Sequence, residues 1–258
     1  MPRSSVVLVT GIAILTVVST VASSRQSKDT QDEKARAKSV QFEAELADAT
    51  EAQFGSLTEC QRFNSRLLYP YRTTSNGTIR DLLTRDDGST FFGLEVSGCG
   101  QELIEPQTPE NYFGELLSAS DAVIHCTATK RTSAITDDEA FIFSDYDVVL
   151  EEVLKDKSDK QLRIGATITV TRPGGKIVIN GIIIKAHSRG YEPLPLNRPL
   201  LLFLKYIPET DVYHATRDVG TFEIEGSSIR SLSMSPYPPG VLRDGVSSLQ
   251  IIRVVSTK

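Results

Sequence analysis

The stretch TRPGGKIVINGIIIKAH, residues 171–187, decides how the rest of the chain is interpreted. Its two glycines and lysine follow an apolar run, as they do in a phosphate-binding loop. Such a loop needs a glycine five residues before Gly175 and a serine or threonine after Lys176. Val170 and Ile177 stand at those positions, so the sequence excludes a phosphate-binding loop of this type.

The same stretch has the pattern of a β-hairpin. The β-branched runs KIVI and IIIK flank Asn180-Gly181, and this dipeptide is the strongest short-range signal for a two-residue hairpin turn. We expect a type I′ turn that pairs Ile179 with Ile182. The Pro-Gly-Gly sequence just before the hairpin is expected to form a corner after the preceding strand. The glycines are therefore expected to serve the backbone.

From about residue 119 the apolar and polar residues alternate, which is typical of half-buried antiparallel strands. In QLRIGATITV (161–170) the apolar side chains fall on one side, and Arg163, Thr167 and Thr169 fall on the other. Turns are expected at Pro208 and Gly226. Further strands are expected in FIFSDYDVVLEEVL, PLLLFLKY, DVYHAT and TFEIEGSSIRSL. About seven strands with short connections predict a mainly β fold, an antiparallel barrel or sandwich of the OB or netrin-like kind, preceded by a small helical region.

Changes in composition divide the chain of 258 residues into five expected parts. They are a signal peptide or N-terminal membrane anchor (1–24), a charged helical spacer (25–50), a small α+β region (51–118), an antiparallel β-barrel domain (119–235) and a C-terminal tail that can form a helix (236–258).

The N-terminal part has an apolar run of about 17 residues, which is close to the lower limit for crossing a bilayer. Arg3 gives it a short basic start, and Thr20 and Ala22 fit the small residues before a cleavage point. A cleaved signal and an uncleaved anchor both fit this pattern. The basic residues that follow the run favour a cytoplasmic position for the segment that carries them. Export remains the expectation, to the periplasm, the extracellular space or a membrane-tethered position facing outward.

The region 51–118 contains local signals for a helix, a second helix and a strand. Ser56 and Glu59 have the spacing of a capping box, with Leu57, Cys60 and Phe63 on one face of the helix that follows. A short helix is expected near TIRDLL (78–83) and a strand near STFFGLEV (89–96).

The three cysteines fall into two kinds of pattern. Cys126 alternates with apolar residues in DAVIHCTA, which predicts a small core side chain. Cys60 and Cys99 show no such pattern. Because an exported protein permits disulfides, these two are the candidate bridge.

Four segments carry a resemblance to known proteins: SASDAVIHCTATKR (118–131), FIFSDYDVVLEEVLKD (141–156), ITVTRPGG (168–175) and PLLLFLKYIPETDVYHA (199–215). Their order resembles exported bacterial β-proteins of uncharacterised function, and more remotely it is similar to the netrin-like, OB-type barrel of metalloproteinase inhibitors. In those inhibitors an N-terminal cysteine supplies the metal-chelating group. Ser118-Ala119-Ser120 open the corresponding region here, so inhibitory activity is not implied.

Composition and motifs exclude several function classes. The formal net charge of −5 disfavours a nucleic-acid partner. The chain has no G-x-S-x-G, H-E-x-x-H or C-x-x-C motif, so we expect no catalytic triad, metal site or cofactor. Asp145, Asp147 and Glu151 lie on one side of a strand and are interpreted as a solvated face, although such carboxylates can bind calcium or act on a sugar.

Two functions remain. The expected one is an exported non-enzymatic binding or interaction module for an unknown protein or envelope polymer, with contact to a membrane only through the N-terminal apolar segment. The alternative is an extracytoplasmic, hydrolase-type enzyme whose site is assembled from several strands.

The hairpin supplies the candidate binding residues. In the expected register Lys176 lies opposite Lys185, His187 follows on the same side, and Arg172 is near the corner. Like charges directly opposite each other on a sheet are unfavourable, so the lysines need water, a carboxylate or a bound anion. Solvation or neutralisation by a carboxylate from the neighbouring strand is one interpretation. The other is a small anion-binding patch of Arg172, Lys176, Lys185 and His187.

Overall fold

The computed structural model describes residues 33–34, 36–67, 77–84, 91–96, 109–158, 160–188, 192–216, 220–226 and 228–232. The chain divides into two compact units, Met1–Asp48 and Ala49–Lys258. In the first unit residues 36–47 form a helix, as the composition of the spacer predicted. Val40 and Leu46 are exposed on it.

The predicted signal or anchor (1–24) and the C-terminal tail (236–258) lie outside the described residues. Within the described ranges, no helix has the length and apolar character needed to cross a membrane.

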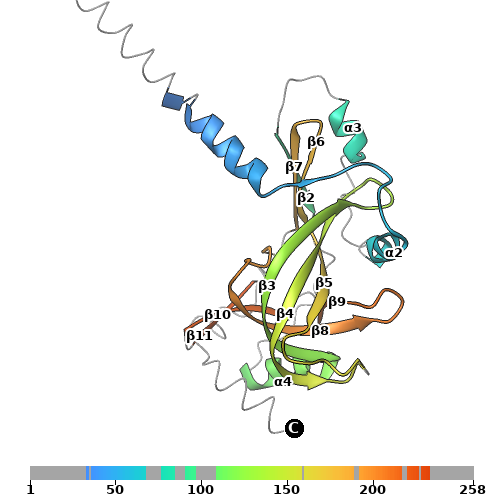
Figure 1. Ribbon diagram of the computed structural model, residues 1–258, viewed down its shortest axis with the longest axis vertical. Coiled ribbons are helices and arrows are strands. Elements are labelled where there is room, and N and C mark those ends of the chain that lie inside the picture. The colour runs from blue at the N-terminus through green and yellow to red at the C-terminus, as the bar shows by residue number, and fades with distance from the viewer. Residues whose placement is uncertain are drawn as a thin grey trace, which may run out of the picture. The chain divides into compact units, whose positions relative to one another are not determined.

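The second unit is mainly β, as predicted, and helices precede its longest strands (Figure 1). The described helices are α2 (Glu59–Leu67), α3 (Ile79–Leu83) and α4 (Pro109–Ala119). The strands are β1 (Thr50–Glu51), β2 (Phe91–Val96), β3 (Ala122–Ile135), β4 (Ile142–Asp156), β5 (Thr167–Pro173), β6 (Gly175–Ile179), β7 (Ile182–Ser188), β8 (Pro199–Ile207), β9 (Val212–Ala215), β10 (Thr221–Glu225) and β11 (Ser228–Ser231).

These strands form two sheets, of seven strands in the order β11-β10-β8-β3-β4-β5-β9 and of four strands in the order β1-β6-β7-β2. Most pairings are antiparallel, but β1–β6, β2–β7 and β5–β9 are parallel. The region 51–118 contributes β1 and β2 to the sheet that holds the β6–β7 hairpin. It therefore belongs to the same compact unit as the strands that follow.

Strand β9 joins two parts of the larger sheet. It pairs with β5 in parallel and with β8 in antiparallel orientation. Strands β3, β4, β5, β9 and β8 thus form a circular set of pairings, which we call the five-strand ring. The inner side of the ring holds one apolar core, which includes Cys126, Tyr146, Val148, Val170 and Tyr213.

The β6–β7 hairpin has the predicted register. Ile179 lies opposite Ile182, and Lys176 opposite Lys185. Asn180 and Gly181 have φ values of 52° and 78°, as the two central residues of a type I′ turn require. The Asn-Gly prediction is confirmed.

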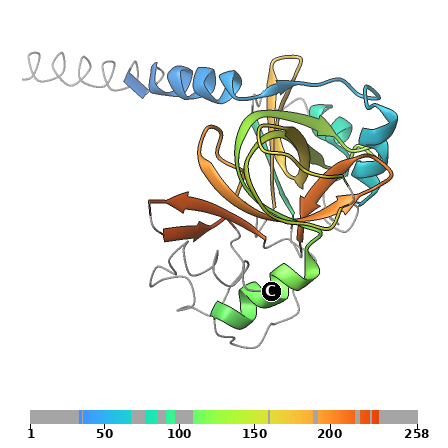
Figure 2. The same ribbon diagram turned by 60° about the horizontal axis from the view of Figure 1, so that its bottom comes forward.

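Two further cores lie outside the ring. One packs the far ends of β3 and β4 against β6, β7 and α3, and includes Phe141, Phe143 and Ile177. The other packs α4 against β3, β8 and β10, and includes Phe113 and Phe203. Figure 2 shows α4 at the opposite end of the unit from the β6–β7 hairpin.

Two local predictions were wrong, and one helix was not predicted. Strand β5 begins at Thr167, because Gln161–Gly165 form a loop in which Ile164 is exposed and Gly165 has a φ of 81°. Helix α4 had no predicted counterpart. Helix α2 begins at Glu59, and Thr58 and Gln61 form the capping box that was assigned to Ser56 and Glu59.

Candidate functional site

A row of polar residues crosses the outer face of the ring. Side chains alternate between the two faces of a strand, and Tyr146, Val170 and Tyr213 point inward. Their neighbours Asp145, Thr171 and His214 therefore point outward. Asp145 lies opposite Thr171, and Thr171 opposite His214. We call Asp145, Thr171 and His214 the outer polar row.

Helix α2 covers the Asp145 end of this row. In Figure 1 it lies between the β3–β4 turn and the β8–β9 turn, and Figure 2 shows the same neighbourhood. Gln61 Nε2 donates to Asp145 Oδ2 at 3.4 Å, and Thr210 Oγ1 in the β8–β9 turn donates to Asn64 Oδ1 at 2.8 Å. In the β3–β4 turn, the Asp137 N–H donates to Ser65 Oγ at 3.2 Å.

The surroundings of Asp145 raise the pKa of its carboxyl. Burial raises its pKa, hydrogen bonding to Thr171 and Gln61 lowers it, and the nearby charge of Asp147 raises it further. From the described residues, no hydrogen bond of ordinary geometry reaches Asp145 Oδ1 or Thr171 Oγ1. The interpretation of Asp145 as part of a solvated face was therefore wrong, because α2 lies over it.

At the other end of the row, burial disfavours the charged form of His214. Burial lowers its pKa, and the nearby positive charge of Lys205 lowers it further, against the opposing effect of Asp121. A neutral imidazole can accept or donate a hydrogen bond without adding charge to this face.

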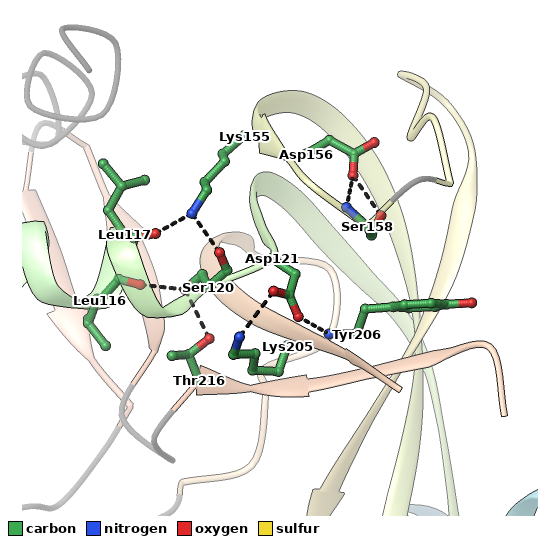
Figure 3. Close-up of polar contacts among 10 residues, drawn as sticks. All are labelled: Leu116, Leu117, Ser120, Asp121, Lys155, Asp156, Ser158, Lys205, Tyr206 and Thr216. Atoms are coloured by element: carbon green, nitrogen blue, oxygen red, sulfur yellow. Dashed lines mark hydrogen bonds and ion pairs between the residues drawn. The ribbon is translucent and has the colours of Figure 1, made fainter. Parts of the chain in front are cut away.

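A second polar cluster joins α4 to the start of the ring (Figure 3). Lys155 Nζ donates to the backbone oxygens of Leu117 and Ser120, so a cation caps the C-terminal end of α4. Ser120 Oγ donates to Leu116 O at 2.6 Å and lies 2.9 Å from Thr216 Oγ1. These contacts satisfy backbone carbonyl groups at the C-terminal end of α4.

Two carboxylates in the same view fix loops and strand ends. Asp121 accepts hydrogen bonds from Lys205 Nζ and the Tyr206 N–H, each at 3.0 Å. Asp156 Oδ1 accepts from the N–H and the hydroxyl of Ser158, at 2.9 and 2.6 Å. The polar groups of this cluster therefore hold α4, β8 and the β4–β5 loop in place through hydrogen bonds.

The four residues of the predicted anion-binding patch differ in burial and in strand pairing. Lys176 and Lys185 are cross-strand partners, as expected, but Lys176 and Arg172 are buried at 7% and 2% exposure. His187 pairs with Glu95 of β2, and its side chain lies outside what is described. The burial of Arg172 and Lys176 therefore prevents their direct contact with a large partner in this structure.

Asp145 and Arg172 lie on opposite faces of the sheet. Arg172 lies opposite Ser144, so its side chain is on the other face of the sheet from Asp145. The role of the patch in binding anions stays a prediction.

The cysteines and the remaining histidine have defined surroundings. Cys126 is fully buried in the ring, as predicted, and burial raises the pKa of its thiol. Cys60 is a free, exposed thiol on α2, and the predicted bridge to Cys99 stays a prediction because Cys99 lies outside the described residues. His125 Nε2 lies 3.4 Å from Glu151 Oε2.

Among the described residues, no group of three or more His, Cys, Asp or Glu side chains is placed to hold a metal ion. The outer polar row was missed by sequence reasoning. Alternation shows which residues of one strand share a face, but the row depends on which strands are neighbours and in which register.

No protein-family model and no curated protein matches this chain.

Proposed function

We propose that this protein is a non-enzymatic binding module that works outside the cytoplasm, and that its binding face is the outer side of β4, β5 and β9. The observation that carries this proposal is the outer polar row, where three neighbouring strands present a buried carboxyl, a hydroxyl and a neutral imidazole on one face.

The circular order of strands supports this choice of face. In OB-type barrels, ligands bind on the second and third strands and on the two loops beside them. Strands β4 and β5 are the second and third of the ring in chain order, and the β3–β4 and β8–β9 turns flank them. This support is an analogy between folds.

The other polar cluster supports a binding role over a catalytic one. Ser120, Lys155 and Asp156 have the residue types of an acid–base site, but their side chains complete the ends of a helix, a strand and a loop. Among the described residues, no comparable arrangement favours the hydrolase-type alternative.

Work outside the cytoplasm is proposed from residues 1–24, as a cleaved signal or a membrane anchor. A phosphatase that is active only outside the cytoplasm, fused after Lys258, should be active. A fluorescent fusion that is bright in the cytoplasm, with no phosphatase activity, would contradict export.

Photo-crosslinking in the native host tests the binding face. A photoreactive residue at Asp147 or Thr169, both on the outer side of the ring, should crosslink the full chain to a defined partner or polymer. The same residue at Glu225, on the β10–β11 hairpin, is the matched control. Equal crosslinking from all three positions, or from none, would reject this face as the binding site.

A further inference from the structure

The side of α2 that faces the ring is polar. Asn64 and Ser65 are its most buried described residues, at 2% and 0% exposure, and Gln61 lies one turn before Ser65. A helix that belongs permanently to a core buries an apolar stripe. Phe63 of α2 is half-buried, and the described contacts of α2 with the β3–β4 turn, β4 and the β8–β9 turn are hydrogen bonds.

The charges of α2 and of the face beneath it are complementary. The Asp145 end of the face and the turns beside it carry the acidic residues Asp137, Asp145, Asp147 and Glu209, whereas Lys130 lies opposite Asp147 and Lys205 lies opposite His214. Helix α2 carries Arg62 and Arg66 against one acid, Glu59. Arg66 already lies 3.5 Å from Asp137 across this interface.

The covered face also has unused hydrogen-bonding capacity. Oδ1 of Asp145 and Oγ1 of Thr171 are buried, and the described residues give neither of them a hydrogen bond of ordinary geometry. Asp145 therefore keeps a long hydrogen bond from Gln61, at 3.4 Å, and a contact with Thr171 outside ordinary hydrogen-bond geometry, so α2 satisfies this face incompletely. A helix of nine residues is not stable by itself, so α2 depends on these same contacts.

We propose that α2 is a releasable cover that occupies the binding face as an internal pseudo-ligand, and that the partner is a basic helical peptide segment which competes with α2 for this face. The inference rests on the proposed function, and it specifies the regulation of that site and the chemistry of its ligand. Uncovering the face exposes a carboxyl, a hydroxyl and acidic turns that an arginine- or lysine-bearing helix can pair with.

A disulfide lock tests the cover. The full chain with Cys60→Ser, Asn64→Cys and Thr210→Cys would be compared oxidised and reduced, with the Cys60→Ser chain as the control for oxidation. The probe is a synthetic peptide of residues 56–67 carrying Cys60→Ser. A second peptide, with Arg62 and Arg66 also replaced by glutamate, controls for charge.

The reduced chain should bind the basic peptide in a salt-dependent way and the acidic peptide at least tenfold more weakly. Oxidation should weaken binding of the basic peptide at least tenfold and slow hydrogen exchange in residues 59–67. Equal binding by the oxidised and reduced chains would show that α2 is not the cover. Absence of binding by both would reject the basic helical ligand.

A second variant keeps the test decisive if the disulfide does not form. Asn64→Ala removes the buried hydrogen bond to Thr210, so it should raise affinity for the basic peptide about fivefold by favouring the open state. Unchanged or weaker binding by a folded Asn64→Ala chain would overturn the proposal. Crosslinking from positions 147 and 169 to a partner that is not a basic helix would still support the proposed binding face if the peptide experiments fail. The proposed function is therefore tested independently of the cover.

Discussion

Asp121 and Asp145 stand beside the same ring, and the structure shifts the pKa values of their carboxyls in opposite directions. Burial acts to raise both. At Asp121 the Tyr206 N–H and the Lys205 ammonium outweigh burial, so the pKa is lowered. At Asp145 burial outweighs the hydrogen bonds from Thr171 and Gln61. The two carboxyls therefore change stability with pH in opposite senses.

Asp121→Asn should lower the free energy of unfolding at pH 7 by about 1–2 kcal/mol, because it removes charge-assisted hydrogen bonds to Lys205 and Tyr206. Since the folded pKa of Asp121 is lowered, its contribution is present above the unfolded pKa of about 4 and is lost as the pH falls through the folded pKa. Urea unfolding from pH 7 to pH 3 would measure this. Equal losses on acidification in the wild type and the variant would contradict it.

Asp145→Asn should have the reverse pH dependence. Because the folded pKa of Asp145 is raised, its contribution is present below about pH 4 and is lost as the pH rises through the folded pKa. The variant should be more stable than the wild type at pH 7, and this gain should disappear near pH 3. Asp147→Asn is the matched control. If the Asp145→Asn variant is less stable than the wild type at pH 7, the prediction is wrong. The Asp145 carboxylate would then accept a stronger hydrogen bond than those from Thr171 and Gln61.

Gly175→Ala should lower the free energy of unfolding by about 3 kcal/mol, through crowding and backbone strain. A Cβ at this position, where φ is 155°, would lie 2.6 Å from Ser133 Oγ and would also collide with Ser144 Oγ. Gly226→Ala is the control, since its φ of 63° is also positive but its Cβ would meet open space. Its loss should be about 1 kcal/mol. Thermal and urea unfolding would compare the two, and equal losses would rule out crowding.

Gly181→Val should destabilise the second unit by about 1 kcal/mol or more, because a β-branched residue resists the positive φ of the type I′ turn. Asn180→Gly, at the other central position, should be tolerated. An unchanged melting temperature for Gly181→Val would mean that the turn does not hold the hairpin register.

Lys185→Glu should raise the free energy of unfolding by about 0.5 kcal/mol, because it places a carboxylate opposite Lys176 in place of a like charge. Lys185→Gln isolates the removal of repulsion and should give a smaller gain. Urea unfolding at low and high salt would measure both. If the predicted anion patch acts in the folded protein, the glutamate variant should also lose salt-sensitive binding to an anionic polymer such as heparin.

Sequence patterns predicted what depends on neighbouring residues. Asn180-Gly181 specified its own hairpin, since the turn fixes the register of the two strands it joins. The same reasoning was wrong at residues 161–166. There Leu162 and Ile164 match a strand period, but Gly165 takes a positive φ and the chain turns before Thr167.

The candidate site depends on contacts that no local pattern contains. The parallel pairing of Thr171 with His214 joins strands from distant parts of the chain. The burial of Asp145 comes from a helix that precedes the ring. The capping box of α2 was assigned to Ser56 and Glu59, and the structure forms it with Thr58 and Gln61.

The way in which β9 joins the ring has a consequence for the order of folding. The β3–β4 hairpin is made by chain neighbours, whereas β5 and β9 meet through two residue pairs that are far apart in sequence. Loop-closure entropy makes such long-range pairings slow and late. Asp145 and Thr171 lie on consecutive strands, so the outer polar row is expected to be complete only after β9 has paired with β5. The binding face that we propose would form only when the last strand has closed the ring.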